Sequence, residues 1–362
     1  MAANLDRAFR EWIKRPDDQR FASLEELYDF TQKRKDYSYE TVKSLDSIHL
    51  GATENGEISL NGNCEPANLS HWAFGQLCSR LKAPANYLRT LSPEMAKDCL
   101  QYGLQHSSEA CKMLIRNTHT NSPNESNRIA SAFTGPSYGR IWDSHVVESL
   151  MRSVEGSGWH IPRNAKSSDN RGLYASDRDM FAFMINGEKP IEVENAKLYR
   201  GFFCWNSETG SATFGLTTFL YNSMCDNHIV YGAEKIQDLR IIHRNQAPMR
   251  FYSQAIPILN RFVENQGFGE EIKSTVAMAM KQPIGKDLEE TLDWFRNKPF
   301  TKKEITSAWE NGLAAGEDVT TRWGMIQGLT SYAQSIPYID KKVNLERRSG
   351  MLLEMNNNGS KI

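Results

Sequence analysis

The chain lacks the cysteine spacings of a disulfide framework or a zinc site. Its six cysteines are scattered over 362 residues, and no two of them form a C-x-x-C pair. It also lacks any run of about 18 apolar residues, the length that a membrane-spanning helix needs. Arg7, Arg10, Lys14 and Arg15 lie near the start, without the apolar stretch of a signal peptide. These absences predict a cytoplasmic protein with reduced thiols and no membrane contact.

The fingerprints of several common cofactor sites are missing as well. The sequence contains no Walker A loop, no G-x-G-x-x-G turn and no H-E-x-x-H zinc motif. Its net charge is -1, so the chain has no general attraction to nucleic acid or to an anionic membrane. Binding of either kind would therefore need a local basic patch.

Helical patterns are present at both ends of the chain. Ser23 and Glu26 have the spacing of a capping box, in which each side chain satisfies a backbone N–H of the other residue. Asn55-Gly56 favours a hairpin between residues 37 and 60, because this pair accepts the positive φ angles of a tight turn. Apolar residues at helical spacing then predict helices between Ser70 and Leu104 and again beyond Pro248.

The sequence predicts a β-sheet in the middle of the chain. Its short runs are rich in aromatic and β-branched residues: Phe181–Ile185, Tyr199–Trp205, Ser211–Leu216, Ile229–Ala233 and Asp238–His243. The connections between them are too short for parallel crossovers, which predicts antiparallel pairing. We therefore predict an α+β fold in four parts: a mixed helical and hairpin N-terminal lobe over residues 1–110, a central antiparallel sheet over 111–250, a helical C-terminal region over 251–355 and a disordered tail over 356–362.

Acidic residues and histidines gather where the predicted strands end. Asp177, Asp179 and Glu208, with His228, are side chains of the kind that bind a divalent metal, and His243 could act as a general base. The same residues also suit a structural role. In that alternative, Asp177 and Glu208 pair with arginines such as Arg178, Arg200 or Arg240.

A run of basic residues follows the last predicted strand. Arg240, His243, Arg244 and Arg250 lie in a stretch from Leu239 to Val263 that contains no carboxylate. Basic residues beside strand aromatics are the combination that holds single-stranded nucleic acid, by phosphate contact and base stacking. The candidate binding residues are therefore Arg240, His243, Arg244, Arg250, Arg200, Trp205 and Phe203. The competing interpretation is that the arginines form a solvated face and the aromatics belong to the core.

Several longer motifs resemble one family. They are Arg20–Leu24, Trp72–Leu77, Pro84–Leu88, Asp177–Phe181, Gly201–Gly210, Asn227–Ala233 and His243. Together they resemble the phage/plasmid-like proteins of domain of unknown function 932, over most of the chain from Arg20 to Leu353. Asp226 and Tyr231 depart from the family pattern, in which a glycine and a tryptophan are expected. The resemblance implies a protein of phages, prophages or conjugative plasmids, without fixing its biochemical role.

That context favours nucleic acid as the partner. We expect single-stranded DNA binding or strand annealing in the recombination or replication of a mobile element, by a homo-oligomer and without a firmly predicted cofactor. One alternative is a metal-dependent hydrolase or nuclease that uses a divalent ion. Another is an anti-defence protein that binds and sequesters a host defence component.

Overall fold

The computed structural model places most of the chain. It describes residues 17–53, 56–62, 66–119, 126–161, 172–188, 190–194, 196–222, 227–229, 239–264, 268–336, 345, 348–353 and 355. The predicted disordered tail and Asn55 of the predicted turn lie outside these residues. No helix in these ranges is long and apolar enough to cross a membrane.

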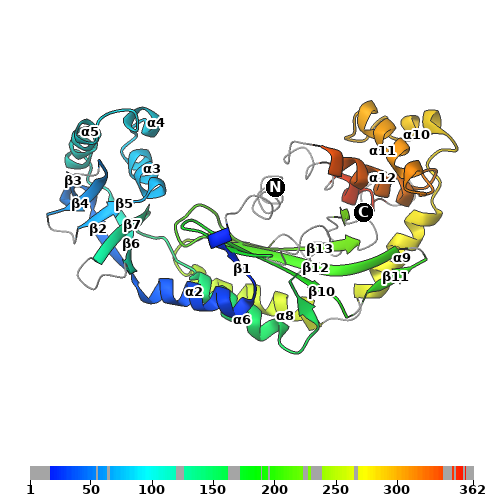
Figure 1. Ribbon diagram of the computed structural model, residues 1–362, viewed down its shortest axis with the longest axis horizontal. Helices are drawn as coiled ribbons and strands as arrows, with labels where there is room; N and C mark the ends of the chain where they lie inside the picture. The colour runs from blue at the N-terminus through cyan, green and yellow to red at the C-terminus, as the bar shows by residue number, and fades with distance from the viewer. Residues whose placement is uncertain are drawn as a thin grey trace.

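The described chain has the predicted α+β architecture, with an antiparallel sheet at its centre. That sheet has the strand order β1-β9-β10-β12-β13-β14, and β8, β11 and β15 pair beside β10, β12 and β13. Its strands are β1 (Arg20–Phe21), β8 (Trp159–His160), β9 (Leu173–Ala175), β10 (Met180–Asn186), β11 (Ile191–Val193), β12 (Ala196–Asn206), β13 (Phe214–Asn222), β14 (Asn227–Ile229) and β15 (Leu239–Ile241). In Figure 1 this sheet lies between an N-terminal lobe and a group of C-terminal helices.

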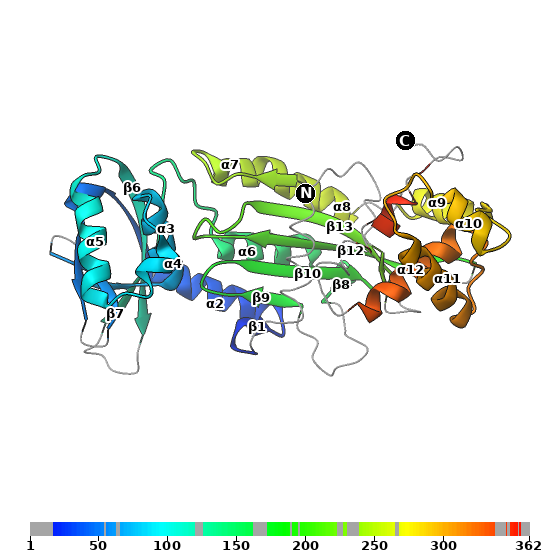
Figure 2. The same ribbon diagram turned by 90° about the horizontal axis from the view of Figure 1, so that it is seen from above.

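Helices cover one face of the central sheet. They are α2 (Leu24–Asp36), α6 (Asp143–Val154) and the continuous run of α7 (Ala247–Arg250), a π-helical turn at Phe251–Ala255 and α8 (Ile256–Glu264). Figures 1 and 2 show α2, α6 and α8 along this face. Half of the capping box predicted at the start of α2 is present: Ser23 accepts from the backbone N–H of Glu26, but the Glu26 carboxylate accepts from Ala22 N and not from the backbone N–H of Ser23.

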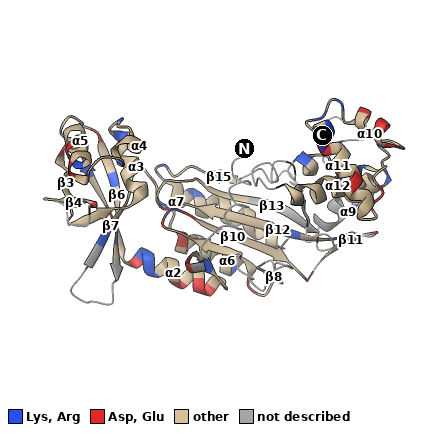
Figure 3. Cartoon of the chain, turned by 45° about the horizontal axis from the view of Figure 1, so that its top comes forward, with Lys and Arg blue, Asp and Glu red and all other residues tan. Residues whose placement is uncertain are grey.

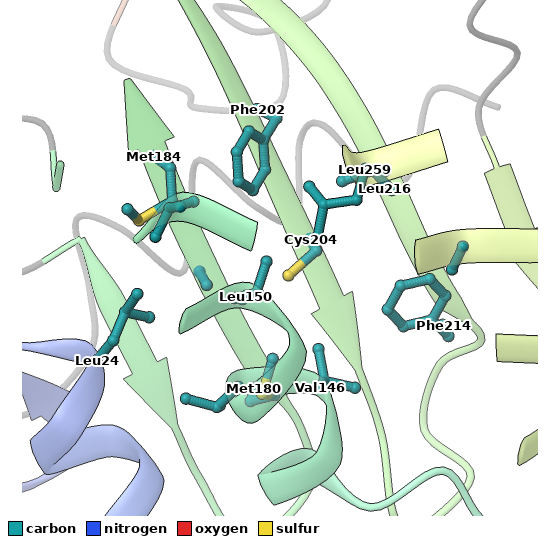
Figure 4. Close-up of a cluster of buried hydrophobic side chains, with 14 of the residues drawn as sticks. Leu24, Val146, Leu150, Met180, Met184, Phe202, Cys204, Phe214, Leu216 and Leu259 are labelled. Carbon is teal, nitrogen blue, oxygen red and sulfur yellow. The ribbon is translucent and has the colours of Figure 1, made fainter. Parts of the chain in front are cut away.

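A hydrophobic core joins these helices to the sheet. Leu24, Val146 and Leu150 from the helices meet Met184 and Phe202 from the strands (Figure 4). Residues of β10 and β12 alternate between the two faces of the sheet, so every second side chain enters this core. Burial of such side chains is the main favourable contribution to folding.

The other face of the central sheet is aromatic. Its buried cluster consists of Tyr174, Phe181, Phe183, Ile185, Phe203 and Trp205. Phe181 lies opposite Trp205, which in turn lies opposite Gly215 on the next strand. The indole ring fills the space beside Gly215, because a Cβ atom there would lie 1.9 Å from a ring carbon. Figure 3 shows how few charges β10, β12 and β13 carry.

The N-terminal lobe has a sheet of its own. The strand order is β2-β6-β7-β5-β4-β3, mixed because β5 and β7 run parallel. The elements are β2 (Ser38–Ser44), β3 (His49–Ala52), β4 (Ile58–Asn61), β5 (Ala67–Leu69), β6 (Ala110–His119), β7 (Ser126–Thr134), α3 (His71–Arg80), α4 (Ala85–Leu88) and α5 (Pro93–Gln105). The hairpin predicted before residue 60 is β3 with β4.

The predicted domain boundaries need correction at two places. Residues 110–134 form β6 and β7, which pair with β2 and β5, so the boundary at residue 111 falls inside a strand of the N-terminal sheet. Residues 251–264 pack beneath the central sheet, because Phe251, Leu259 and Phe262 belong to its core. The separate C-terminal helices are α9 (Phe268–Lys281), α10 (Leu288–Trp294), α11 (Lys302–Ala314) and α12 (Arg322–Ser335).

Candidate functional site

A buried cluster of charges lies where the N-terminal lobe meets the central sheet. We call it the junction cluster: Arg34 of α2, Arg116 of β6, Asp143 of α6, and Asn206 and Glu208 at the end of β12. Nη2 of Arg116 lies 2.5 Å from Oε2 of Glu208, and Nη2 of Arg34 lies 2.5 Å from Oδ2 of Asp143. The cluster therefore connects elements from both sheets.

Glu208 is the most fully occupied group of the junction cluster. Its Oε2 atom faces Arg116 at 2.5 Å and Arg34 at 3.5 Å, and its Oε1 atom accepts from the backbone N–H of Asp143 at 2.9 Å. Asp143 is the first residue of α6, so the carboxylate also lies at the positive end of a helix dipole. The Glu208 side chain is only 1% exposed, and its contacts hold α2, β6 and α6 together.

The pKa values of the two carboxyl groups in the junction cluster are shifted in opposite directions. Burial works against ionisation of Glu208, but Arg34 and Arg116 together lower its pKa below the ordinary value. Burial and the neighbouring Glu208 raise the pKa of Asp143 to about 7. Burial, and then repulsion by Arg34, lower the pKa of Arg116 to about 10. The arrangement thus favours an ionised Glu208 held by two arginines.

The predicted acidic metal set does not converge in the described structure. Asp177 has a 61% exposed side chain near Arg178, whereas Asp179 is buried and bonds to the Ser176 hydroxyl. Glu208 is occupied by Arg34 and Arg116, not by the Arg178, Arg200 or Arg240 proposed from the sequence. His228 lies in β14, and its side chain is outside the described part. Within that part, no group of three or more His, Cys, Asp or Glu residues is placed to bind a metal ion.

His243 is buried, so in this conformation its ring is not accessible to act as the predicted general base. Its Nδ1 atom lies 3.2 Å from the carbonyl oxygen of Gly139, and since a carbonyl can only accept, Nδ1 carries the hydrogen. The ring stacks on Tyr138 with centroids 5.1 Å apart. Burial, with help from Arg140, lowers the pKa of His243 to about 4, despite the opposing hydrogen bond to Gly139.

This environment predicts a measurable pH effect on stability. The folded state binds fewer protons than the unfolded state between the folded pKa of about 4 and the ordinary value of 6.5, so stability rises with pH there. His243→Asn keeps a donor for Gly139 but cannot titrate. As pH rises through this range, the free energy of unfolding of the wild type should increase by up to about 1.4 kcal/mol per pH unit more than that of the variant. Urea unfolding at several pH values measures the difference. Parallel stability curves from pH 4.5 to 6.5 would contradict the assignment.

The sequence motif G-x-S-x-G occurs at Gly135–Gly139, between β7 and α6. In a hydrolase this pattern presents a serine that bonds to a histidine base. Ser137 is exposed, and its hydroxyl makes no hydrogen bond with any described residue; its carbonyl accepts from Asn245 N. The segment therefore lacks the hydroxyl-to-base contact of an assembled triad.

The predicted basic run forms an exposed edge of the central sheet. We call residues 239–250 the arginine segment. Arg240 and Arg244 are exposed, and Arg250 is half-buried with Nη2 donating to the carbonyl oxygens of Ile242 and Arg244 at 2.9 Å. Arg244 has no carboxylate within 4.0 Å among the described residues. Strand β15 pairs with β13, which places Arg240 opposite Gly215 at the sheet edge.

Burial corrects four of the predicted nucleic-acid contacts. Trp205 and Phe203 are each 2% exposed within the aromatic cluster, so neither ring can stack on a base in this conformation. Arg200 is buried on the helical face, where its guanidinium lies over Phe262 and Trp159 and donates to the Phe262 carbonyl. His243 is likewise enclosed.

An exposed aromatic residue that the sequence did not reveal is Tyr252. It lies in the π-helical turn directly after α7 and is 47% exposed. Its helical neighbours Phe251 and Ala255 are buried, so the periodicity of the segment indicates core rather than surface. Tyr252 follows Arg250 by two residues in the chain, and its ring lies against His145 of α6 and Phe251.

Comparison with family models, with curated proteins and with solved structures finds no match to this chain.

Proposed function

We propose that the protein binds single-stranded nucleic acid along the arginine segment, in the service of strand annealing or replication of a mobile element. The observation that carries this proposal is the exposure of Arg240, Arg244 and Tyr252 in one stretch of 25 residues, from Leu239 to Val263, without a carboxylate. Phosphate neutralisation by arginine and stacking on an aromatic ring are the two contacts that such binding uses.

The charge of the whole chain makes this local arrangement important. At a net charge of -1, long-range attraction of a polyanion is weak, so affinity depends on the arginine segment itself. Ile242 and Met249 are 67% and 64% exposed in the same segment. These two side chains are available for apolar contact with bases while the arginines contact the phosphates.

Replacement of the two exposed arginines should weaken binding and its salt dependence together. We expect Arg240→Ala/Arg244→Ala to reduce the slope of log affinity against log salt by about 0.7 for each phosphate that these side chains neutralise. Fluorescence anisotropy of a labelled oligothymidylate measures this. Lys302→Ala/Lys303→Ala removes the same charge from exposed positions at the start of α11 and serves as the matched control. Equal affinities and slopes in both double variants would exclude the arginine segment as the binding surface.

Tyr252 provides an independent test through stacking. Replacing it with alanine should cost about 1–3 kcal/mol of binding free energy, the contribution of one stacked base. Tyr252→Phe keeps the ring and should bind nearly as well as the wild type. If the alanine and phenylalanine variants bind equally well, the ring makes no stacking contact.

A further inference from the structure

A second pair of basic groups lies beside Tyr252, outside the arginine segment. Nζ of Lys35, at the end of α2, is 2.8 Å from Nε2 of His145, in the first turn of α6. The ring of His145 lies 6.2 Å from that of Tyr252, centroid to centroid. Lys35, His145 and Tyr252 thus come together from three helical segments on one face of the sheet.

The junction cluster fixes the position of this pair. Lys35 and His145 follow Arg34 and Asp143 closely in the chain, and Arg34 and Asp143 form an ion pair at 2.5 Å beneath them. Because α2 and α6 are held together at that point, the lysine and the histidine are brought close without a carboxylate between them. No Asp or Glu oxygen among the described residues lies within 4.0 Å of either side chain.

The close approach of two basic groups is unfavourable for protonated histidine. Lys35 is a cation and donates to Nε2, which can accept only while the imidazole is neutral. Burial and then Lys35 lower the pKa of His145, and the more distant Glu148 and Glu208 oppose them only in part. Tyr252 and the Glu148–Arg152 pair are the other polar groups facing this position.

We propose that Lys35 and His145 form a phosphate-binding site that receives the backbone of the strand held by the arginine segment and Tyr252. This inference rests on the proposed function and assigns it a second contact. When a phosphodiester oxygen arrives, the Lys35 ammonium turns from Nε2 to that oxygen. His145 then takes one proton from solution and donates from Nε2 to the phosphate. Binding is therefore coupled to the uptake of one proton.

The pH dependence of binding tests the site. With labelled oligothymidylate, the wild type should gain affinity as pH falls, by up to about tenfold per unit for one proton taken up. His145→Gln keeps a polar side chain but cannot titrate, so its affinity should change less with pH. His106→Gln, an exposed position on the N-terminal lobe, is the matched control and should behave as the wild type.

The outcomes separate this inference from the proposed function. If the wild type binds the strand but His145→Gln shows the same pH profile and Lys35→Gln the same affinity, the phosphate site is wrong and the proposed function stands. If the wild type does not bind the strand at low salt, the proposed function fails. In that case an NMR pH titration of the His145 ring, with and without inorganic phosphate, tests the phosphate site separately. Phosphate should raise the pKa of His145 if the site exists, and an unchanged pKa would contradict it.

Discussion

Replacing Glu208 with glutamine should lower the free energy of unfolding by about 3–5 kcal/mol, because it leaves buried Arg116 without a carboxylate partner and leaves Arg34 with Asp143 alone. Arg116 has a 9% exposed side chain and Arg34 a 12% exposed one, so water cannot readily replace the missing partner. The amide also removes the favourable charge at the start of α6. Urea unfolding at neutral pH, followed by tryptophan fluorescence, measures the change.

Glu148→Gln is the matched control for this result. It makes the same chemical change in a surface pair with Arg152, where side chains are 38% and 76% exposed. Surface pairs of this kind contribute about 0–1 kcal/mol. A loss of stability at Glu208 no larger than that at Glu148 would show that the junction cluster does not anchor the two sheets.

Replacing Trp205 with alanine should also destabilise the protein, by about 3–5 kcal/mol, as deletion of a buried tryptophan usually does. The ring is enclosed by Phe203 and Phe181 and fills the space beside Gly215. Trp205→Phe retains most of this packing and should be destabilised less. Thermal and urea unfolding of the two variants provide the comparison.

The same variant distinguishes core from binding surface. Under conditions where Trp205→Ala is still folded, its affinity for oligothymidylate should change less than that of Tyr252→Ala. Normal stability together with abolished binding would mean that Trp205, and not Tyr252, is the stacking ring. Trp205 would then have to become exposed when the strand binds.

Local sequence pattern was enough to predict much of the central sheet. The runs Phe181–Ile185 and Tyr199–Trp205 became β10 and β12, because aromatic and β-branched residues suit a buried strand. The predicted run Ser211–Leu216 overlaps the start of β13, which the structure continues through Asn222. Residues 111–134 were assigned to the wrong sheet, since their pairing with β2 and β5 depends on residues far away in the chain.

The ion pairs of the junction cluster could not be predicted from the sequence. Glu208 was recognised as a notable residue, yet its partner Arg116 lies 92 residues away and Asp143 lies 109 residues from Arg34. Such pairs depend on how the two sheets meet, and no local spacing encodes that. Likewise, alternation shows that Trp205 and Phe203 share a face of the sheet, but not whether that face is covered.

The most direct test of single-strand binding is the salt dependence of oligothymidylate affinity for the wild-type protein, measured by fluorescence anisotropy with and without chelator. We predict saturable binding that survives chelation. The affinity should fall linearly with salt on logarithmic axes, with a slope of about 0.7 for each phosphate neutralised. Absence of binding at low salt, or an affinity that does not change with salt, would contradict this prediction.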